Sequence, residues 1–393
     1  MRPQLSSPAD FSLVAGGPAH WLQERLGLIR PGAPNLARRA GLSVLLTWVP
    51  LLLLSAMQGL AIGDHVRLPF LYDFAAYTRF LVAIPLLILA EGLIERRVAE
   101  VVVHFTHSGL VPESSLPGYE AALDRGKRLR DSTLAEVVLV GLAALSVVIV
   151  RHEFPFEFST WRSLVSDSGH TRTLAGWWYL VVGGGLFQFL IWRWLWRLFI
   201  WYWFLWRVSK LELRLIPTHP DGAAGLGFVG ETQRFFWSIV FAFSATTAGV
   251  LANEIVYGGV SLRHYQIPMA GYVVVVLLVF LGPLVMFMPR MIEAKIKSLH
   301  DYSALAVTHN RMFDGKWVQG DNPKGEPVLG TPEISSLADL GNAYDVLDRM
   351  RPVPFDPADA VVLVLAAAIP MTPLLLTVMP VGRLLELVSK FLV

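Results

Sequence analysis

The sequence of 393 residues contains no cysteine. Disulfide bonds, thiolate metal sites and thiol chemistry are therefore excluded for this chain. Charge is also scarce, because only 16% of the residues are Asp, Glu, Lys or Arg, whereas a soluble domain has about a quarter. The formal charge of +2 is too small to favour a nucleic-acid partner.

The signatures of common enzyme classes are missing as well. The chain has no H-E-x-x-H, no G-x-S-x-G, no P-loop and no protein-kinase motif. Gly225, Gly227 and Gly230 match G-x-G-x-x-G in spacing, but a dinucleotide site requires a preceding strand, and here a Trp-rich apolar segment precedes. An enzymatic activity is therefore not favoured, and no metal or cofactor is expected.

Apolar residues are abundant, at 54% of the chain with a mean hydropathy of +0.51. A membrane-spanning helix needs about 20 mostly apolar residues. The segments that meet this condition are Gly41–Ile62, part of Leu71–Val98, Thr133–Val150, Leu174–Trp196, Phe235–Val256, Pro268–Met288 and Ala360–Met379. We predict an all-α polytopic transmembrane bundle of about seven spans. Pro370 and Pro373 leave an alternative open, in which the last segment is a re-entrant hairpin and the spans number six.

Basic residues concentrate on one side of these spans. By the positive-inside rule, this asymmetry predicts a cytoplasmic N-terminus. The expected organisation is a cytoplasmic N-terminal segment (1–40) with an interfacial amphipathic helix, a bundle of six spans (41–289), a helical cytoplasmic segment (290–357), and a last span with an amphipathic tail (358–393). Within the third part, we expect a helix over Met291–Met312 and a second over Glu333–Met350, which Thr331 caps.

The most aromatic stretch follows the predicted fourth span. Trp prefers the membrane–water boundary, and Arg side chains there can extend to the lipid headgroups. A helix that starts at Leu174 has risen by about 28 Å at Arg193, which is close to the full hydrocarbon thickness. We therefore interpret the residues at the two ends of this span as interfacial anchors: Trp177, Trp178, Trp192, Arg193, Trp196 and Arg197.

The second span necessarily contains an ionisable residue. If it runs from Leu71 to Ala90, Arg79 lies about 12 Å deep, and if it begins at Phe80, Glu91 lies about 16 Å deep. Such groups face either a cavity or a structural partner, and the sequence leaves both open. Gln188, at the middle of the fourth span, is a candidate partner, so Arg79, Glu91 and Gln188 are the candidate transport residues.

A glycine-dense turn joins the fourth and fifth spans. Backbone N–H groups beside basic residues can bind an anion, although a tight turn between two spans needs no ligand. The candidate anion-binding residues are His219, Asp221, Gly225, Gly227, Arg207 and Arg214. At the far end of the fifth span, Asn253 and Glu254 either line a vestibule or are ordinary helix-end residues.

Three segments carry a resemblance to a known group of proteins. They are Pro217–Gly230, Ser335–Phe355 and Pro373–Pro380. Together they resemble an uncharacterised family of bacterial multi-pass membrane proteins. The resemblance implies a location in the bacterial inner membrane, and no activity.

Three functional hypotheses follow, of which the third is a membrane-embedded enzyme that acts on lipids and requires a cluster of catalytic groups around His219, Asp221 and His104. The first is a channel or transporter for a small ion or solute, because of the charge in the second span and the prolines in the last. The second is a membrane-anchored sensor or scaffold, in which residues 290–357 bind a cytoplasmic protein. The bilayer itself is the expected partner, and a homo-oligomer stays open.

Overall fold

The computed structural model describes residues 11–29, 35–151, 156–167, 169–319 and 332–377. Helices make up most of this part of the chain, with one short antiparallel hairpin formed by β1 (Ser163–Ser166) and β2 (Gly169–Arg172). Predicted features that lie outside the described residues are the cap at Thr331, the tail Arg383–Val393 and the end of the last span.

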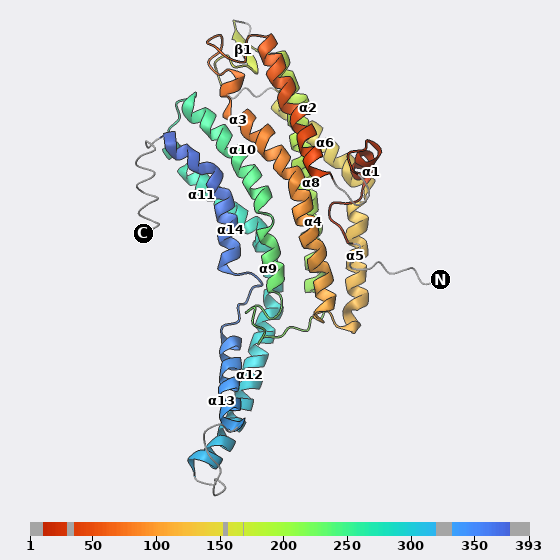
Figure 1. Ribbon diagram of the computed structural model, residues 1–393, viewed down its shortest axis with the longest axis vertical. Coiled ribbons are helices and arrows are strands. Elements are labelled where there is room, and N and C mark those ends of the chain that lie inside the picture. Colours follow the sequence, from red (N-terminus) through yellow and green to blue (C-terminus); the bar gives the residue numbers. More distant parts are fainter. Residues whose placement is uncertain (1–10, 30–34, 152–155, 168, 320–331, 378–393) are drawn as a thin grey trace, which may run out of the picture.

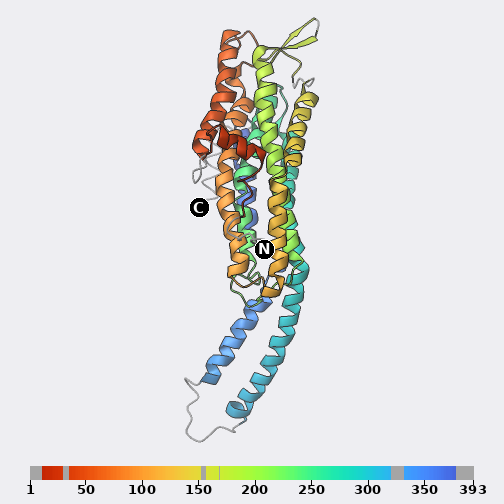
Figure 2. The ribbon, with the colours of Figure 1, turned by 90° about the vertical axis from the view of Figure 1, so that its right-hand side faces the viewer.

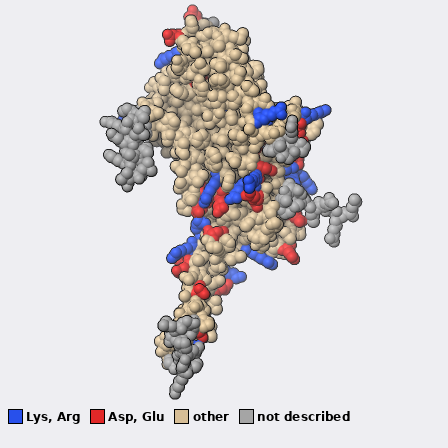
Figure 3. Space-filling model, in the orientation of Figure 1, with Lys and Arg blue, Asp and Glu red and all other residues tan. Residues whose placement is uncertain are grey.

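Among the described residues, seven helices are long and apolar enough to cross a membrane. They are Leu36–Met57, Phe74–His107, Thr133–Val150, Leu174–Ser209, Gly227–Val256, Leu262–Val318 and Pro357–Thr377. The all-α bundle with seven candidate spans is thus confirmed, and the protein is an integral, multi-pass membrane protein. On the face shown in Figure 3, the upper part of the molecule is almost free of charged side chains, as contact with lipid requires.

The spans are built from the following elements: α2 (Leu36–Met57), α3 (Phe74–Tyr77), α4 (Ile84–His107), α6 (Thr133–Val150), α7 (Leu174–Trp178), α8 (Gly185–Ser209), α9 (Gly227–Arg234), α10 (Trp237–Val256), α11 (Leu262–Phe280), α12 (Met288–Phe313) and α14 (Pro357–Ala368). π-helical turns join α3 to α4 (η3, Thr78–Ala83) and α7 to α8 (η5, Tyr179–Gly184). Shorter elements are α1 (Pro18–Arg25), α5 (Leu116–Arg130), the 3₁₀ turns η2 (Phe70–Tyr72), η4 (Glu113–Ser115), η6 (Gly282–Phe287) and η8 (Ile369–Thr377), and the π turn η7 (Asp314–Val318).

The molecule is elongated, and its two ends differ (Figure 1). One end carries the β1–β2 hairpin and is called the hairpin end. At the other, α12 and α13 (Pro332–Asp348) project beyond the bundle as an antiparallel pair, called the stalk, which Figure 2 shows from the side. The two helices expected in the cytoplasmic segment are therefore both present, with α12 continuing the sixth span.

Several predicted boundaries were wrong, each for a local reason. The first span ends at Met57 instead of Ile62, because Gly59 adopts a positive φ of 69° and the amide of Leu60 turns back to the carbonyl of Ser55. The fourth span continues to Ser209 instead of ending near Trp196. Its last turns are buried by aromatic packing, since Phe204 contacts Tyr119 of α5 and Phe11 of the N-terminal segment.

Candidate functional site

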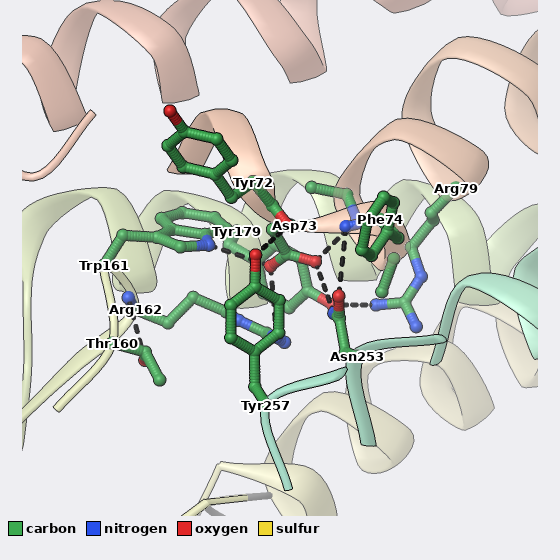
Figure 4. Close-up of polar contacts among 12 residues, drawn as sticks. Tyr72, Asp73, Phe74, Arg79, Thr160, Trp161, Arg162, Tyr179, Asn253 and Tyr257 are labelled. Atoms are coloured by element: carbon green, nitrogen blue, oxygen red, sulfur yellow. Dashed lines mark hydrogen bonds and ion pairs between the residues drawn. The ribbon is translucent and has the colours of Figure 1, made fainter. Parts of the chain in front are cut away.

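Asp73 is the centre of a polar cluster at the hairpin end. Its carboxylate is completely buried and caps α3 by accepting from the amide of Ala76 at 3.0 Å. It also accepts from Trp161 Nε1 at 2.8 Å and from Asn253 Nδ2 at 2.7 Å, and pairs with Arg162 at 3.1 Å. The cluster therefore ties the start of the second span to α10 and to the segment that leads into β1 (Figure 4).

Arg162 remains charged in this cluster. Burial by itself would lower the pKa of Arg162, but the Asp73 carboxylate outweighs burial and raises the pKa above its ordinary value. The guanidinium also stacks on the Tyr179 ring, with 4.8 Å from Cζ to the ring centroid. Arg162 thus extends from the Asp73 carboxylate towards the fourth span.

Arg79 lies next to this cluster, on the other side of Tyr179. Its Nη1 donates a hydrogen bond to the Tyr179 hydroxyl, and its Cζ lies 5.3 Å and 5.2 Å from the ring centroids of Tyr179 and Phe187. The second span begins at Phe74, so Arg79 lies about 8 Å along the helix, slightly shallower than the first of the two predicted registers. In the described part of the chain, Arg79 has no carboxylate within ion-pair distance.

The two spans that hold Arg79 and Tyr179 both depart from α-helical geometry at this depth. η3 and η5 are π-helical turns, and they touch each other because Phe80 packs edge-on against Tyr179 at 5.5 Å. Gly183 faces the same Phe80 ring, and a Cβ at this position would lie only 2.7 Å from it. π-helical turns in helices occur frequently at functional sites.

A partly enclosed cavity of about 390 Å³ opens between these elements. Its lining combines apolar residues with three arginines, one acid and one amide: Arg79, Arg162, Arg172, Glu254 and Asn253. Arg172 donates to the carbonyl of Arg151 at 2.6 Å, and Glu254 accepts from the hydroxyl of Tyr265. Asn253 and Glu254 therefore line a cavity, which was one of the two alternatives for them.

A second cluster surrounds Glu91, nearer the stalk end. Glu91 is 1% exposed and lies about 26 Å along its helix from Phe74. Its carboxylate pairs with Arg39 at 2.6 Å and Arg197 at 3.0 Å, with Arg193 farther away at 3.8 Å. One carboxylate thus joins α2, α4 and α8 through three guanidiniums.

The interpretation of Arg193 and Arg197 as snorkelling anchors differs from what the structure shows. Their side chains are only 6% and 3% exposed, and both turn inward to Glu91 instead of outward to solvent. The buried Glu91 carboxylate supplies a partner that the sequence does not reveal. Of the Trp residues assigned with them, Trp177 is 50% exposed, whereas Trp178, Trp192 and Trp196 are partly buried in the bundle.

Gln188 is half-buried on α8, and no described contact joins it to Arg79 or Glu91. Its neighbour Phe187 is the residue that contacts Arg79. The structure therefore places Arg79 in one cluster and Glu91 in another, and it does not bring the three candidate transport residues together.

The glycine turn contains its own anion. The Asp221 carboxylate accepts from the amides of Ala223 at 2.8 Å, Gly225 at 3.2 Å and Gly227 at 2.9 Å, and His219 Nδ1 lies 2.9 Å away. Burial alone would raise the pKa of Asp221, but these hydrogen bonds lower it below its usual value. The N–H groups expected to hold an external anion are thus occupied by an internal carboxylate.

Arg207 and Arg214 do not complete an anion site at this turn. Arg207 is exposed beside the Trp206 ring, and the exposed Arg214 lines a different pocket with residues of α12. Instead, the turn binds the segment between α13 and α14, because Arg351 donates to the carbonyl of Asp221 at 2.7 Å. The glycine turn is therefore a docking point between the bundle and the stalk.

Several residues of these clusters were missed in the sequence. Asp73 and Arg162 lie in loops between spans, and Arg39 lies just before the predicted first span, where its charge indicated only orientation. A signal existed for Asp73, because an Asp before Phe74 fits the pattern of a helix N-cap. No sequence pattern pairs it with Arg162 or Asn253.

Comparisons of the chain with protein-family models, with curated proteins and with solved structures found no significant match. The resemblance of three segments to a family of bacterial multi-pass proteins stays a prediction. The fold and the contacts described above are therefore the basis for the function.

Proposed function

We propose that the protein is a transporter for a small solute, which it binds in the cavity at the hairpin end. The observation that carries this proposal is the position of that cavity. It is lined by residues of the second to fifth spans, of the β1–β2 hairpin and of the loop before it, and it contains Arg79, an ionisable residue inside a spanning helix. Ionisable residues in such positions typically belong to substrate or ion pathways.

The arrangement of the two polar clusters supports alternating access. The cavity lies near the hairpin end, whereas the Glu91 cluster joins α2, α4 and α8 farther along the bundle. π-helical turns inside helices occur frequently at functional sites, and here η3 and η5 replace α-helical geometry in two spans beside the cavity. In this proposal the Glu91 cluster closes the stalk side in the conformation described.

The positive-inside rule places the stalk end in the cytoplasm and the cavity on the opposite side. The concentration of basic residues on the stalk side supports this orientation. We also propose the bacterial inner membrane as the location, on the basis of the resemblance given above.

Solute flux in reconstituted vesicles tests the proposal. Vesicles with and without the purified full-length protein are exposed to a hyperosmotic solution of one solute at a time, which is a sodium salt, a potassium salt or a neutral polyol. The recovery of vesicle volume is followed by light scattering. We expect protein-dependent recovery for at least one class of solute, and a slower recovery for Arg79→Gln. A folded protein that gives no recovery with any class would contradict a transport function.

The stalk supports a second candidate function, the binding of a protein partner. Several large apolar side chains on its surface are more than half exposed: Ile296, Leu305, Val307 and Met312. α13 carries four acidic residues and no basic one, namely Glu333, Asp339, Asp345 and Asp348. Exposed apolar side chains next to a charged helix are typical of protein-binding surfaces.

Deleting α13 would not test this function cleanly, because Leu347 of this helix is buried. Substitution of the exposed Leu305 and Met312 by Asp leaves that buried contact intact. If the stalk binds a partner, the double variant abolishes a cellular phenotype of the protein while its unfolding temperature stays unchanged. An unaltered phenotype would count against the scaffold.

A further inference from the structure

Arg79 lacks the partner that a guanidinium in a spanning helix requires. In the described part of the chain it has no ion-pair partner, and its buried Nε has no hydrogen-bond acceptor. Its one side-chain hydrogen bond is to the neutral hydroxyl of Tyr179. A charged side chain within the bilayer is costly unless an opposite charge or a strong acceptor accompanies it.

The other arginines of the cavity do not share this situation. Arg162 is paired with Asp73, and Arg172 donates to two carbonyl groups, those of Val150 and Arg151. Glu254 is the acid that lines the cavity, and it accepts from Tyr265. Among the described lining residues, Arg162 thus has Asp73 as its counter-ion, whereas Arg79 has no carboxylate within ion-pair distance.

The geometry around Arg79 limits how an anion can approach. The rings of Tyr179 and Phe187 lie against the guanidinium, which leaves its edges for hydrogen bonding. A guanidinium presents parallel N–H donors that match the two oxygens of a carboxylate or phosphate. The hydroxyl of Tyr179, which accepts from Arg79 and lines the cavity, can donate a hydrogen bond to the same ligand.

The volume of the cavity indicates the size of the ligand. At about 390 Å³ it is at the lower end of the range for small-molecule sites, about 300–1,000 Å³. A bare halide or a single phosphate would leave most of this space unfilled. An organic ligand of a few carbon atoms would fill it and would also contact the apolar lining residues, such as Leu180 and Val250.

We propose that the cavity binds a small organic oxyanion whose carboxylate or phosphate group pairs with Arg79. This proposal rests on the solute site given under the proposed function, and it adds the chemical class of the solute. The same chemistry could be supplied by a soluble metabolite or by the headgroup of an anionic lipid, and the experiment separates these two sources.

Equilibrium binding to the purified full-length protein tests the proposal. Lactate, succinate, inorganic phosphate and a short-chain phosphatidylglycerol are titrated separately in detergent, and binding is followed by calorimetry. We expect at least one organic oxyanion to bind more tightly than inorganic phosphate. Saturation by phosphatidylglycerol alone would identify a lipid headgroup as the ligand, whereas binding of lactate or succinate would identify a soluble one.

Two variants show whether Arg79 is the binding residue. Arg79→Gln removes the charge, and we expect it to weaken binding at least about ten-fold, the effect of losing a hydrogen bond to a charged group. The matched control is Arg67→Gln, which changes an exposed arginine at the same end of the bundle and is expected to leave binding unchanged. Equal affinity of the Arg79→Gln and wild-type proteins would overturn the proposal, as would the absence of binding by every oxyanion.

Folding of Arg79→Gln is checked from its thermal unfolding curve, and a second measurement covers the case in which it does not fold. In a protein with Val250→Cys, a bound oxyanion should slow modification of the cavity thiol by maleimide, while all other residues remain native. No protection at saturating concentrations of each oxyanion would contradict the proposal. Neither measurement requires flux. A transporter of neutral or cationic solutes would therefore show no oxyanion binding and no thiol protection, but it would still give volume recovery in the vesicle assay.

Discussion

Asp73 makes four polar contacts while it is completely buried, so each of its oxygen atoms is satisfied from two sides. Asp73→Asn keeps the shape of the side chain but replaces an acceptor oxygen with an NH₂ group that faces Trp161 and Arg162. Breaking a buried ion pair from one side costs about 3–5 kcal/mol. We expect the unfolding free energy to fall by this amount in thermal or denaturant unfolding followed by Trp fluorescence. Asp64→Asn, at an exposed position in the preceding loop, is the matched control and should change stability little.

The distances in the Glu91 cluster predict which substitutions lower the unfolding free energy most. Glu91→Gln leaves three buried guanidiniums without their carboxylate, whereas Arg193→Gln removes the guanidinium that is farthest from it, at 3.8 Å. The first substitution should therefore destabilise the protein by about 3–5 kcal/mol, and the second by clearly less. Unfolding curves of the two variants in the same detergent measure this order, and a larger effect of Arg193→Gln would show that Glu91 is not the centre of the cluster. For the same reason, loss of flux in Glu91→Gln would not by itself indicate a transport role.

At the scale of elements, the contact between η3 and η5 depends on Gly183. An added methyl group there would lie 2.7 Å from the buried Phe80 ring, so the two spans would have to move apart. We expect Gly183→Ala to destabilise the protein by about 1–3 kcal/mol and to weaken oxyanion binding, because Tyr179 and Arg79 belong to these turns. Gly185→Ala, two residues away with no atom within 4 Å of the added Cβ, is the control and should be neutral or slightly stabilising. Equal behaviour of the two variants in unfolding and binding measurements would contradict this account of the π turns.

The glycine turn predicts a pH dependence. The pKa of Asp221 is lower in the folded protein than its ordinary value of 3.8, so its carboxylate stabilises the fold at pH values above 3.8. This contribution is lost as the pH falls through the lowered pKa. Unfolding temperatures measured between pH 7 and pH 3 should therefore converge for the wild-type protein and Asp221→Asn at the acid end, with the variant less stable at pH 7. A constant difference over the whole range would show that the charge of Asp221 is not what holds the turn.

The positions of the spanning helices could be predicted from the sequence, whereas most contacts between side chains could not. Apolar length alone located the seven spans, because each backbone segment in a bilayer must form a helix. The ends of the helices depend on tertiary contacts, which cannot be predicted from the length of an apolar segment. For example, the fourth span is extended because Phe204 packs against Tyr119 of α5. Arg79 and Glu91 were recognised because a charge inside an apolar helix is conspicuous. The partners of Glu91 come from α2 and α8, and their pairing required the tertiary structure.

At the scale of the whole molecule, three regions with different properties follow one another along the bundle. The hairpin end contains the cavity with Arg79, the upper part of the face in Figure 3 is an almost uncharged surface, and the stalk carries charged and exposed apolar side chains. This arrangement suits a protein that binds a solute on one side of a membrane and projects helices on the other. The stalk and the bundle meet where Arg351 and Arg234 pair with Asp356, so a movement of the bundle could be transmitted to the stalk.

The absence of cysteine allows a direct test of alternating access, which is the central claim of this account. A single Val250→Cys substitution places a thiol at the cavity, and Leu278→Cys, on the exposed apolar surface of α11, is the lipid-facing control. A membrane-impermeant maleimide is added to oriented vesicles from either side. We predict that Val250→Cys is modified rapidly from the hairpin side and more slowly from the stalk side, and that Leu278→Cys is modified from neither. Modification of Val250→Cys from the hairpin side alone, under all solute conditions, would contradict transport and leave a one-sided solute-binding protein.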